Sequence, residues 1–140
     1  MSKPFKITYS AMNADMGAVH KEFDETYAKL KLELGYDVPS MVAGRAIQSG
    51  RTNQKFNPVH TTELIAKYHV VSESELNEAF LASRKAQKSW GATSWQERVR
   101  ITKKAAELIR ERRMKIAALM TLEIGKNRME SLGDAEESAD

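Results

Sequence analysis

The feature that most constrains the fold of this chain is a change of sequence pattern at Ser72. Upstream, short apolar runs alternate with turn residues, as in short strands, whereas downstream apolar residues recur every three or four positions, as in helices. A few short strands followed by several helices make a small sheet without partners for its edges, and such a sheet is marginal on its own. The sequence therefore predicts an α/β fold whose remaining strands lie on another stretch of chain.

Upstream of this change we expect one helix and three strands. The helix runs from residue 13 or 15 to residue 34, and Gly35 supplies its stop. Its apolar face is formed by Met16, Val19, Phe23, Tyr27, Leu30 and Leu34. Residues 41–47 and 52–56 are expected to form an antiparallel hairpin about a Ser49-Gly50 turn, and residues 64–71 a third strand.

Downstream, helix-start signals divide the helical region. Ser72 and Glu75 have the spacing of a capping box, which begins a helix expected to end at Gly91. Ser94 and Glu97 form a second box, before a pattern long enough for two helices with a break in residues 110–115. Residues 127–140 begin a further helix without a stop signal, since its last charged residues are acidic. We therefore expect either a frayed tail or a chain cut out of a longer one.

Composition limits the chemistry that the chain can perform. Its 140 residues, 41% of them hydrophobic, suffice for one core. The chain contains no cysteine, which excludes disulfides, thiolate metal sites and a cysteine nucleophile within it. There is no apolar run of membrane-spanning or signal-peptide length, so we expect no membrane association and a cytoplasmic location.

Charge is unevenly distributed around a small net value of +3. Residues 98–115 contain eight basic and two acidic residues, and residues 121–140 contain six acidic and two basic ones. A basic helix can bind nucleic acid by neutralising phosphates. The basic residues here point in several directions and alternate with glutamates that can pair with them, which is typical of a solvated helix face. Nucleic-acid binding is therefore disfavoured.

No complete active site is visible. Neither GxGxxG nor GxxxxGK occurs, so we predict no cofactor-binding loop and no catalytic residue in this chain. His20, His60 and His69 lack the spacing of metal ligands, so we expect surface or strand histidines and no metal site. Trp90 and Trp95 flank a corner between two helices, and packing at that corner is favoured over ligand stacking.

From residue 57 onward the sequence resembles the N-terminal third of the aldehyde dehydrogenase superfamily. The resemblance rests on six elements in order over about 85 residues. These elements are Asn57-Pro58, residues 72–75, Trp90, residues 94–98, residues 122–126 ("LEIGK") and residues 130–134. The preceding "ELGYDVPSMVAGR" and the long N-terminal helix are similar to the branch that oxidises glutamate semialdehyde in proline catabolism, the 1-pyrroline-5-carboxylate dehydrogenases.

The resemblance implies an incomplete part of an NAD-binding domain. Residues 1–38 would be an N-terminal helical arm and residues 39–140 the N-terminal part of that domain. In the family, a cysteine thiolate attacks the aldehyde, hydride passes to the nicotinamide, and a glutamate activates the water that hydrolyses the thioester. All these groups lie downstream of residue 140. The implied cofactor of the complete enzyme is NAD or NADP, which this segment alone is not expected to bind.

One residue of this segment is implied to contact substrate. In the suspected branch, a carboxylate shortly after the "GK" faces the substrate ammonium group, and Glu130 occupies that position. The alternative is a glutamate favoured by the N-terminal end of a helix dipole. Glu123 also matches a family position, and we assign it to structure.

Two functions from different classes remain open. The first is a segment of an oxidoreductase that is inactive alone and acts with the remainder of the aldehyde dehydrogenase chain in a homo-oligomer. The second is a free-standing helical module that binds a protein partner through its exposed edges.

Overall fold

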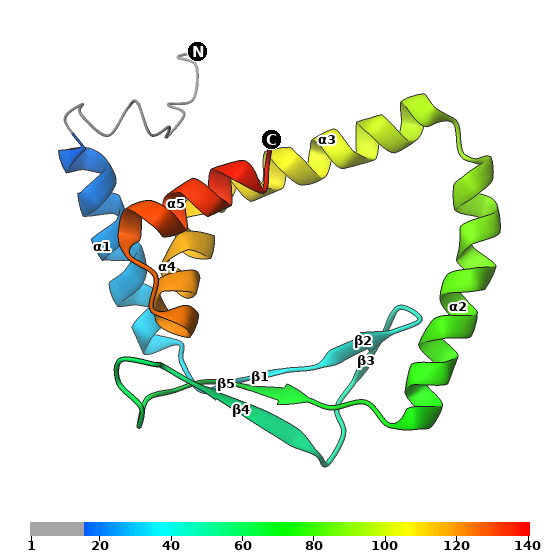
Figure 1. The fold of residues 1–140 in the computed structure, drawn as a ribbon, viewed down its shortest axis with the longest axis horizontal. Helices are drawn as coiled ribbons and strands as arrows, with labels where there is room; N and C mark the ends of the chain where they lie inside the picture. The colour runs from blue at the N-terminus through cyan, green and yellow to red at the C-terminus, as the bar shows by residue number, and fades with distance from the viewer. Residues whose placement is uncertain (1–15) are drawn as a thin grey trace.

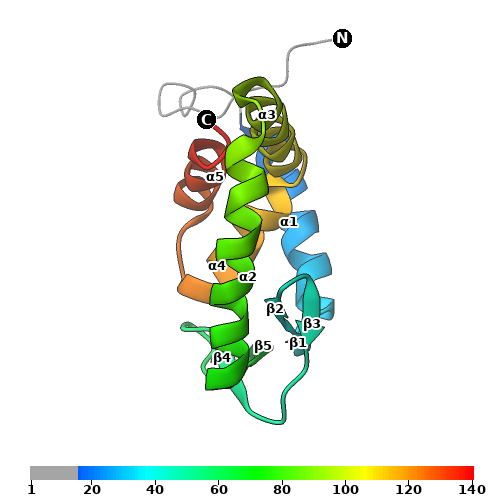
Figure 2. The same cartoon turned by 90° about the vertical axis from the view of Figure 1, so that its right-hand side faces the viewer.

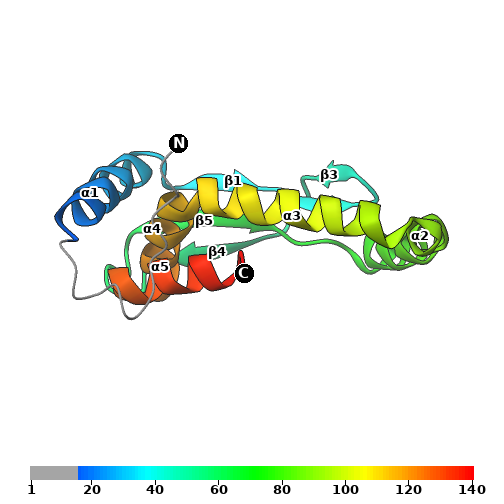
Figure 3. The same ribbon diagram turned by 90° about the horizontal axis from the view of Figure 1, so that it is seen from above.

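The computed structural model describes residues 16–140, which form a mixed α/β fold, as predicted (Figure 1). The strands occupy one side, α1, α4 and α5 cluster at one end, and α2 stands at the other end (Figures 1 and 3). The elements in chain order are α1 (Gly17–Leu32), β1 (Tyr36–Val38), β2 (Ser40–Val42), β3 (Arg45–Ile47), β4 (Thr52–Phe56), β5 (Leu64–His69), α2 (Glu73–Ala92), α3 (Trp95–Glu111), α4 (Arg113–Ile124) and α5 (Arg128–Glu137).

The first helix is confirmed over most of its predicted length. Its expected start at residue 13 or 15 lies outside the described residues, and its last helical residue is Leu32 rather than residue 34. Gly35 has a φ of +87°, which glycine adopts without strain, and its N–H donates to the Ile65 carbonyl. The helix stop therefore also joins α1 to the sheet.

The predicted hairpin is wrong. Residues 41–47 form not one strand but two, β2 and β3, which pair antiparallel around Ala43 and Gly44. Both turn residues have positive φ, +50° and +80°, as a tight two-residue hairpin requires. Ser49-Gly50 instead lies in the connection from β3 to β4, where the Ser49 hydroxyl is 2.8 Å from the carbonyl oxygens of both Arg51 and Val70 and can donate its proton to either.

Strand β4 pairs with β5, not with residues 41–47. The three-stranded sheet has the order β1-β5-β4, with β1 parallel and β4 antiparallel to β5. A register shift between Lys55 and Phe56 leaves an extra residue in β5. This irregularity breaks the alternation of the strand, and both Ile65 and Ala66 are fully buried. The third strand was predicted correctly, although it ends at His69 rather than at residue 71.

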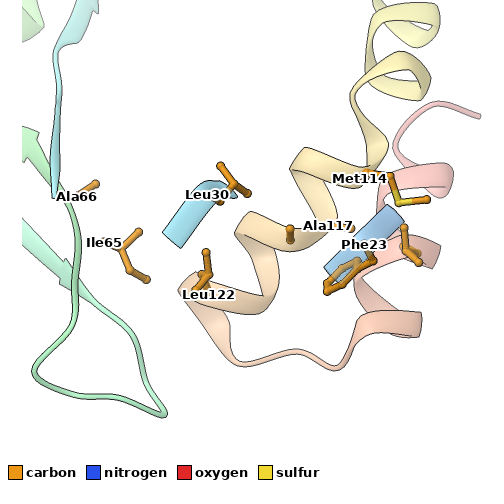
Figure 4. Close-up of a cluster of buried hydrophobic side chains, with 9 residues drawn as sticks. Phe23, Leu30, Ile65, Ala66, Met114, Ala117 and Leu122 are labelled. Atoms are coloured by element: carbon orange, nitrogen blue, oxygen red, sulfur yellow. The ribbon is translucent and has the colours of Figure 1, made fainter. Parts of the chain in front are cut away.

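One hydrophobic core joins α1, the sheet, α4 and α5. Leu122 of α4 lies near Ile65 of β5 and Leu30 of α1, and Phe23 lies farther along the same helix pair beside Ala117 (Figure 4). Ala117 and Leu122 are fully buried. Because α1 contributes Phe23 and Leu30 to this core, it packs as an integral layer against α4.

Helices α2 and α3 lie apart from that core. Ser72 caps α2 in a complete capping box with Glu75, as predicted, and α2 runs one residue beyond Gly91. Ser94 accepts from the Glu97 amide at the start of α3, while the Glu97 carboxylate binds Arg100 instead of completing the second box. Neither helix contains a buried residue.

The α2–α3 corner is exposed. Figure 1 shows α2 apart from α1, α4 and α5, with β2 and β3 beside its N-terminal half, and Figure 2 faces its outer side. The strand against which it packs is β2. The Arg45 guanidinium of β3 binds both carboxylate oxygens of Glu78 there, at 2.6 and 2.7 Å. Trp90 and Trp95 are 45% and 65% exposed, so the predicted packing at this corner does not occur within the described residues.

The long helical pattern breaks at Arg112, inside the predicted segment, and α4 begins at Arg113. Helix α5 ends at Glu137, so the helix expected to continue through the last residues stops before them. Within residues 16–140, no helix has both the length and the apolarity needed to cross a membrane.

Candidate functional site

Three of the segments that carry the family resemblance meet at the turn between α4 and α5. Gly125 ends α4 in the left-handed region, with a φ of +72°. A Cβ placed on it would lie 3.3 Å from Cγ of Pro58, so the loop after β4 packs closely against this turn. The Asn57-Pro58, "LEIGK" and residue 130–134 elements, distant in sequence, therefore build one corner of the fold.

Asn57 shapes the loop on its side of this corner. It is 3% exposed, and its side-chain oxygen accepts from the amides of Val59 and His60. Its side-chain nitrogen donates to the Glu63 carboxylate at 2.7 Å, and Lys31 of α1 binds the other oxygen of Glu63 at 2.8 Å. The hydrogen bond from Lys31, followed by that from Asn57, lowers the pKa of Glu63 below its ordinary value. The two ends of the loop between β4 and β5 are therefore joined to each other and to α1.

Glu123 lies on the last turn of α4 and contacts the sheet. The Tyr68 hydroxyl of β5 donates to its carboxylate at 2.6 Å. This hydrogen bond, assisted by burial and by the negative charge of Glu123, raises the pKa of Tyr68 to about 12. The structural role that we assigned to Glu123 agrees with this contact. No local pattern in the sequence indicates Tyr68, because its partner Glu123 lies 55 residues away.

The first turn of α5 is held by several polar contacts. Asn127 caps the helix by accepting from the Glu130 amide at 3.0 Å, and Lys126 forms an ion pair with Asp134. Arg128 pairs with Asp24 of α1, and its guanidinium carbon lies 4.7 Å from the Phe23 ring centroid. These contacts fix the start of α5 against α1 and against the α4–α5 turn.

Glu130, the residue implied to contact substrate, lies on this first turn and is exposed. The neighbouring cations Lys126 and Arg128 are paired with Asp134 and Asp24. No ion pair within residues 16–140 involves the Glu130 carboxylate. An external cation would therefore not have to displace an internal partner of Glu130.

The described residues contain no group of three or more metal-ligating side chains. His20 lies on α1, His60 in the loop between β4 and β5, and His69 on β5, where its Nδ1 is 2.7 Å from the Ser49 carbonyl. The side-chain-capped helix N-termini, those of α2, α3 and α5, each carry glutamate in the first turn. Such carboxylates repel phosphate, so these helix ends do not suit a dinucleotide.

The comparisons with known proteins agree on one family. Residues 45–140 match the aldehyde dehydrogenase family model. The chain is 36% identical over 120 residues to a 1-pyrroline-5-carboxylate dehydrogenase of Staphylococcus haemolyticus, covering 86% of this chain and 23% of that protein. A protein of the same name from Staphylococcus epidermidis is 33% identical, with the same coverage of both chains.

The fold is also found among solved structures. The structure of 1-pyrroline-5-carboxylate dehydrogenase from Thermus with bound NAD superposes with a TM-score of 0.88 at 24% identity. The superposition covers 99% of this chain and 27% of that one, and at this identity it establishes the fold. The chain spans about a quarter of the length of the curated relatives it matches. On the evidence of the family model and these relatives, it belongs to the aldehyde dehydrogenase family.

Proposed function

We propose that this chain is the N-terminal part of a dehydrogenase that oxidises L-glutamate 5-semialdehyde, the open form of 1-pyrroline-5-carboxylate, to glutamate with NAD or NADP. The observation that carries the proposal is the 36% identity to a 1-pyrroline-5-carboxylate dehydrogenase over 86% of the chain. The superposition on the Thermus enzyme supports the same fold over nearly the whole chain. A cytoplasmic location belongs to the same proposal.

The chemistry is divided between this segment and the rest of the enzyme. The chain contains no cysteine, so the thiolate nucleophile of the family must be supplied by another stretch of chain. Glutamates in the first turns of α2, α3 and α5 disfavour phosphate there, so we assign cofactor binding to the remainder. This segment supplies the scaffold of the α4–α5 turn and, on it, Glu130.

Glu130 is proposed to bind the substrate ammonium group. Its carboxylate is exposed and its neighbouring cations are paired elsewhere, so its negative charge is available to a cationic amino group. The N-terminal turn of a helix is also a favourable place for an acidic side chain.

Partner surfaces are proposed from the uncovered helices. Leu76 and Phe80 of α2 are 61% and 62% exposed, and Trp95 of α3 is 65% exposed. Large apolar side chains on two helices without a buried residue indicate a surface that another polypeptide covers. We assign this surface to the remainder of the dehydrogenase chain, in an enzyme that forms a homo-oligomer. The division into an arm (residues 1–38) and part of an NAD-binding domain (residues 39–140) belongs to the same proposal.

The experiment compares two proteins. The first is the 140-residue chain; the second, called the joined protein, is this chain fused to the part of the S. haemolyticus relative that it does not cover. We expect no aldehyde-dependent NAD reduction from the chain alone and turnover of glutamate semialdehyde by the joined protein. Turnover by the chain alone would contradict the proposal. A folded joined protein that oxidises other aldehydes but not this one would refute the substrate.

The exposed surface of α2 and α3 also suits the second candidate, a protein-interaction module. Size-exclusion chromatography, circular dichroism and co-expression with the separate remainder distinguish the two functions. A monodisperse, cooperatively folding chain that does not associate with the remainder supports the module. Association that restores activity supports the dehydrogenase.

A further inference from the structure

Glu123 lies where a carboxylate is unfavourable. It is the penultimate residue of α4, at the negative end of the helix dipole, where an acidic side chain is destabilising. The hydrogen bond from Tyr68 compensates for that position, since bonds to an ionised carboxylate are among the stronger hydrogen bonds in proteins. The pair therefore fixes the end of α4 to β5 at a defined point.

The chain that follows Glu123 has little freedom before it reaches Glu130. Gly125 turns in the left-handed region against Pro58, and Asn127 caps α5. Lys126, in the middle of the turn, forms an ion pair with Asp134, which lies one helical turn beyond Glu130 in α5. A displacement of the end of α4 is therefore transmitted to the first turn of α5 and to the Glu130 side chain.

We propose that Tyr68 is a positioning residue for Glu130: its hydroxyl holds Glu123, and through Glu123 the α4–α5 turn, in the place where the Glu130 carboxylate meets the substrate ammonium group. The inference rests on the proposed function and extends it to a residue of the sheet. Tyr68 itself touches neither substrate nor cofactor in this scheme. It acts indirectly, by restricting the movement of Glu130, which contacts the substrate. Residues behind a binding site commonly hold the contacting groups in place in this way.

The first test uses the 140-residue chain and amide hydrogen exchange. Tyr68→Phe removes the hydroxyl and retains the ring. We expect exchange at the amides of Glu130 and Ser131 to accelerate about tenfold or more, the equivalent of one hydrogen bond to a charged group, with α1 unchanged. The matched control is Tyr36→Phe on the adjacent strand, whose hydroxyl is also within the electrostatic reach of Glu123 but donates no hydrogen bond to it, so we expect no local change. Equal exchange in both variants would overturn the inference.

The second test uses the joined protein and separates the inference from the function on which it rests. We expect Tyr68→Phe and Glu130→Gln each to raise KM for glutamate semialdehyde about fivefold or more with little effect on kcat. The double variant is expected to be no worse than Glu130→Gln alone, because both changes remove the same contact. An aldehyde without the amino group should show no KM change, which a general loss of structure would not reproduce.

Each outcome decides one of the two proposals. If Glu130→Gln raises KM and Tyr68→Phe does not, the positioning role is refuted and the substrate contact stands. If Glu130→Gln leaves KM unchanged, the substrate contact is wrong and the inference falls with it. The oxidation of glutamate semialdehyde by the joined protein is judged separately from either result.

Discussion

Phe80 provides the most direct test of whether α2 is covered by another polypeptide. Its side chain is 62% exposed, and its ring contact is with Arg84, whose guanidinium carbon lies 5.9 Å from the ring centroid. An exposed contact of this kind contributes about 0.5 kcal/mol, and alanine is the better helix former by a similar amount. In the 140-residue chain, Phe80→Ala should therefore change the free energy of unfolding by less than about 0.5 kcal/mol.

In the joined protein the same substitution should be costly. A phenylalanine side chain presents about 200 Å² of surface, so covering the exposed part buries about 120 Å², worth roughly 3 kcal/mol at about 25 cal/mol per Å². Phe23, which is 3% exposed in the core, is the matched control. Phe23→Ala should cost about 3–5 kcal/mol in both proteins, because the core that it leaves is present in each.

The assay is urea denaturation followed by circular dichroism, with both proteins at one concentration. A loss of more than about 1.5 kcal/mol from Phe80→Ala in the chain alone would show that this ring is already packed, contrary to its exposure. An unchanged joined protein would show that the remainder does not cover α2. In that case the surface would be free for a separate partner, as the interaction module requires.

Three further substitutions probe local features. Gly125→Ala should destabilise the chain by about 1–2 kcal/mol, because its φ is +72° and its Cβ would press on the neighbouring loop, whereas Gly133→Ala within α5, with no atom near its Cβ, should be neutral or stabilising; urea denaturation measures both. Ser72→Ala should cost about 1 kcal/mol and accelerate amide exchange in the first turn of α2, because it removes the capping box. Tyr68 has a pKa raised from 10.0 to about 12, so its contribution to stability is complete below pH 10 and lost as the pH rises toward 12. Lys31, Tyr36 and Lys104 also have raised pKa values and lose stabilisation at high pH, so denaturation across this range should show a steeper decline for the unsubstituted chain than for Tyr68→Phe. An equal slope for the two would contradict the assignment.

The sequence predicted those features whose determinants lie within a few residues. The Ser72–Glu75 capping box is complete within four positions, and the structure shows both of its hydrogen bonds. The break between α3 and α4 and the stop at Gly35 were likewise local. The family resemblance was also readable, because its motifs are short segments in a fixed order.

The strand pairing could not be predicted in the same way. Ser49-Gly50 is an ordinary turn signal, whereas the true hairpin turns at Ala43, a residue that rarely adopts positive φ. Residues 52–56 pair instead with β5, in a register set by contacts along the whole strand pair. The local hydrophobic period of a segment does not show which strand it will pair with. Strand β1 was missed since it has only three residues and ends before Pro39.

The candidate site shows the same limit. The sequence placed Glu130 on the first turn of a helix, and the Asn127 cap confirms that placement. It did not reveal that Tyr68 binds Glu123 or that Pro58 packs on Gly125, because both contacts join segments more than fifty residues apart. These contacts bring the separate sequence motifs together at the α4–α5 turn.

Helices α2 and α3 connect these observations to function. Most helices in proteins owe their stability to the packing of an apolar face. These two have no buried residue, and local contacts replace one: the Ser72 box on α2, and on α3 the Ser94 cap and the pairs of Arg100 with Glu97 and Lys104 with Glu107. Each such contact contributes only tenths of a kcal/mol to about 1 kcal/mol. The Arg45–Glu78 pair joins α2 to β3, and the Arg110–Asp140 pair joins α3 to the last residue, but neither contact covers an apolar side chain. The exposed apolar side chains of α2 and α3 therefore add to stability only when another surface covers them, and burial of Phe80 in the joined protein is the expected sign of that covering.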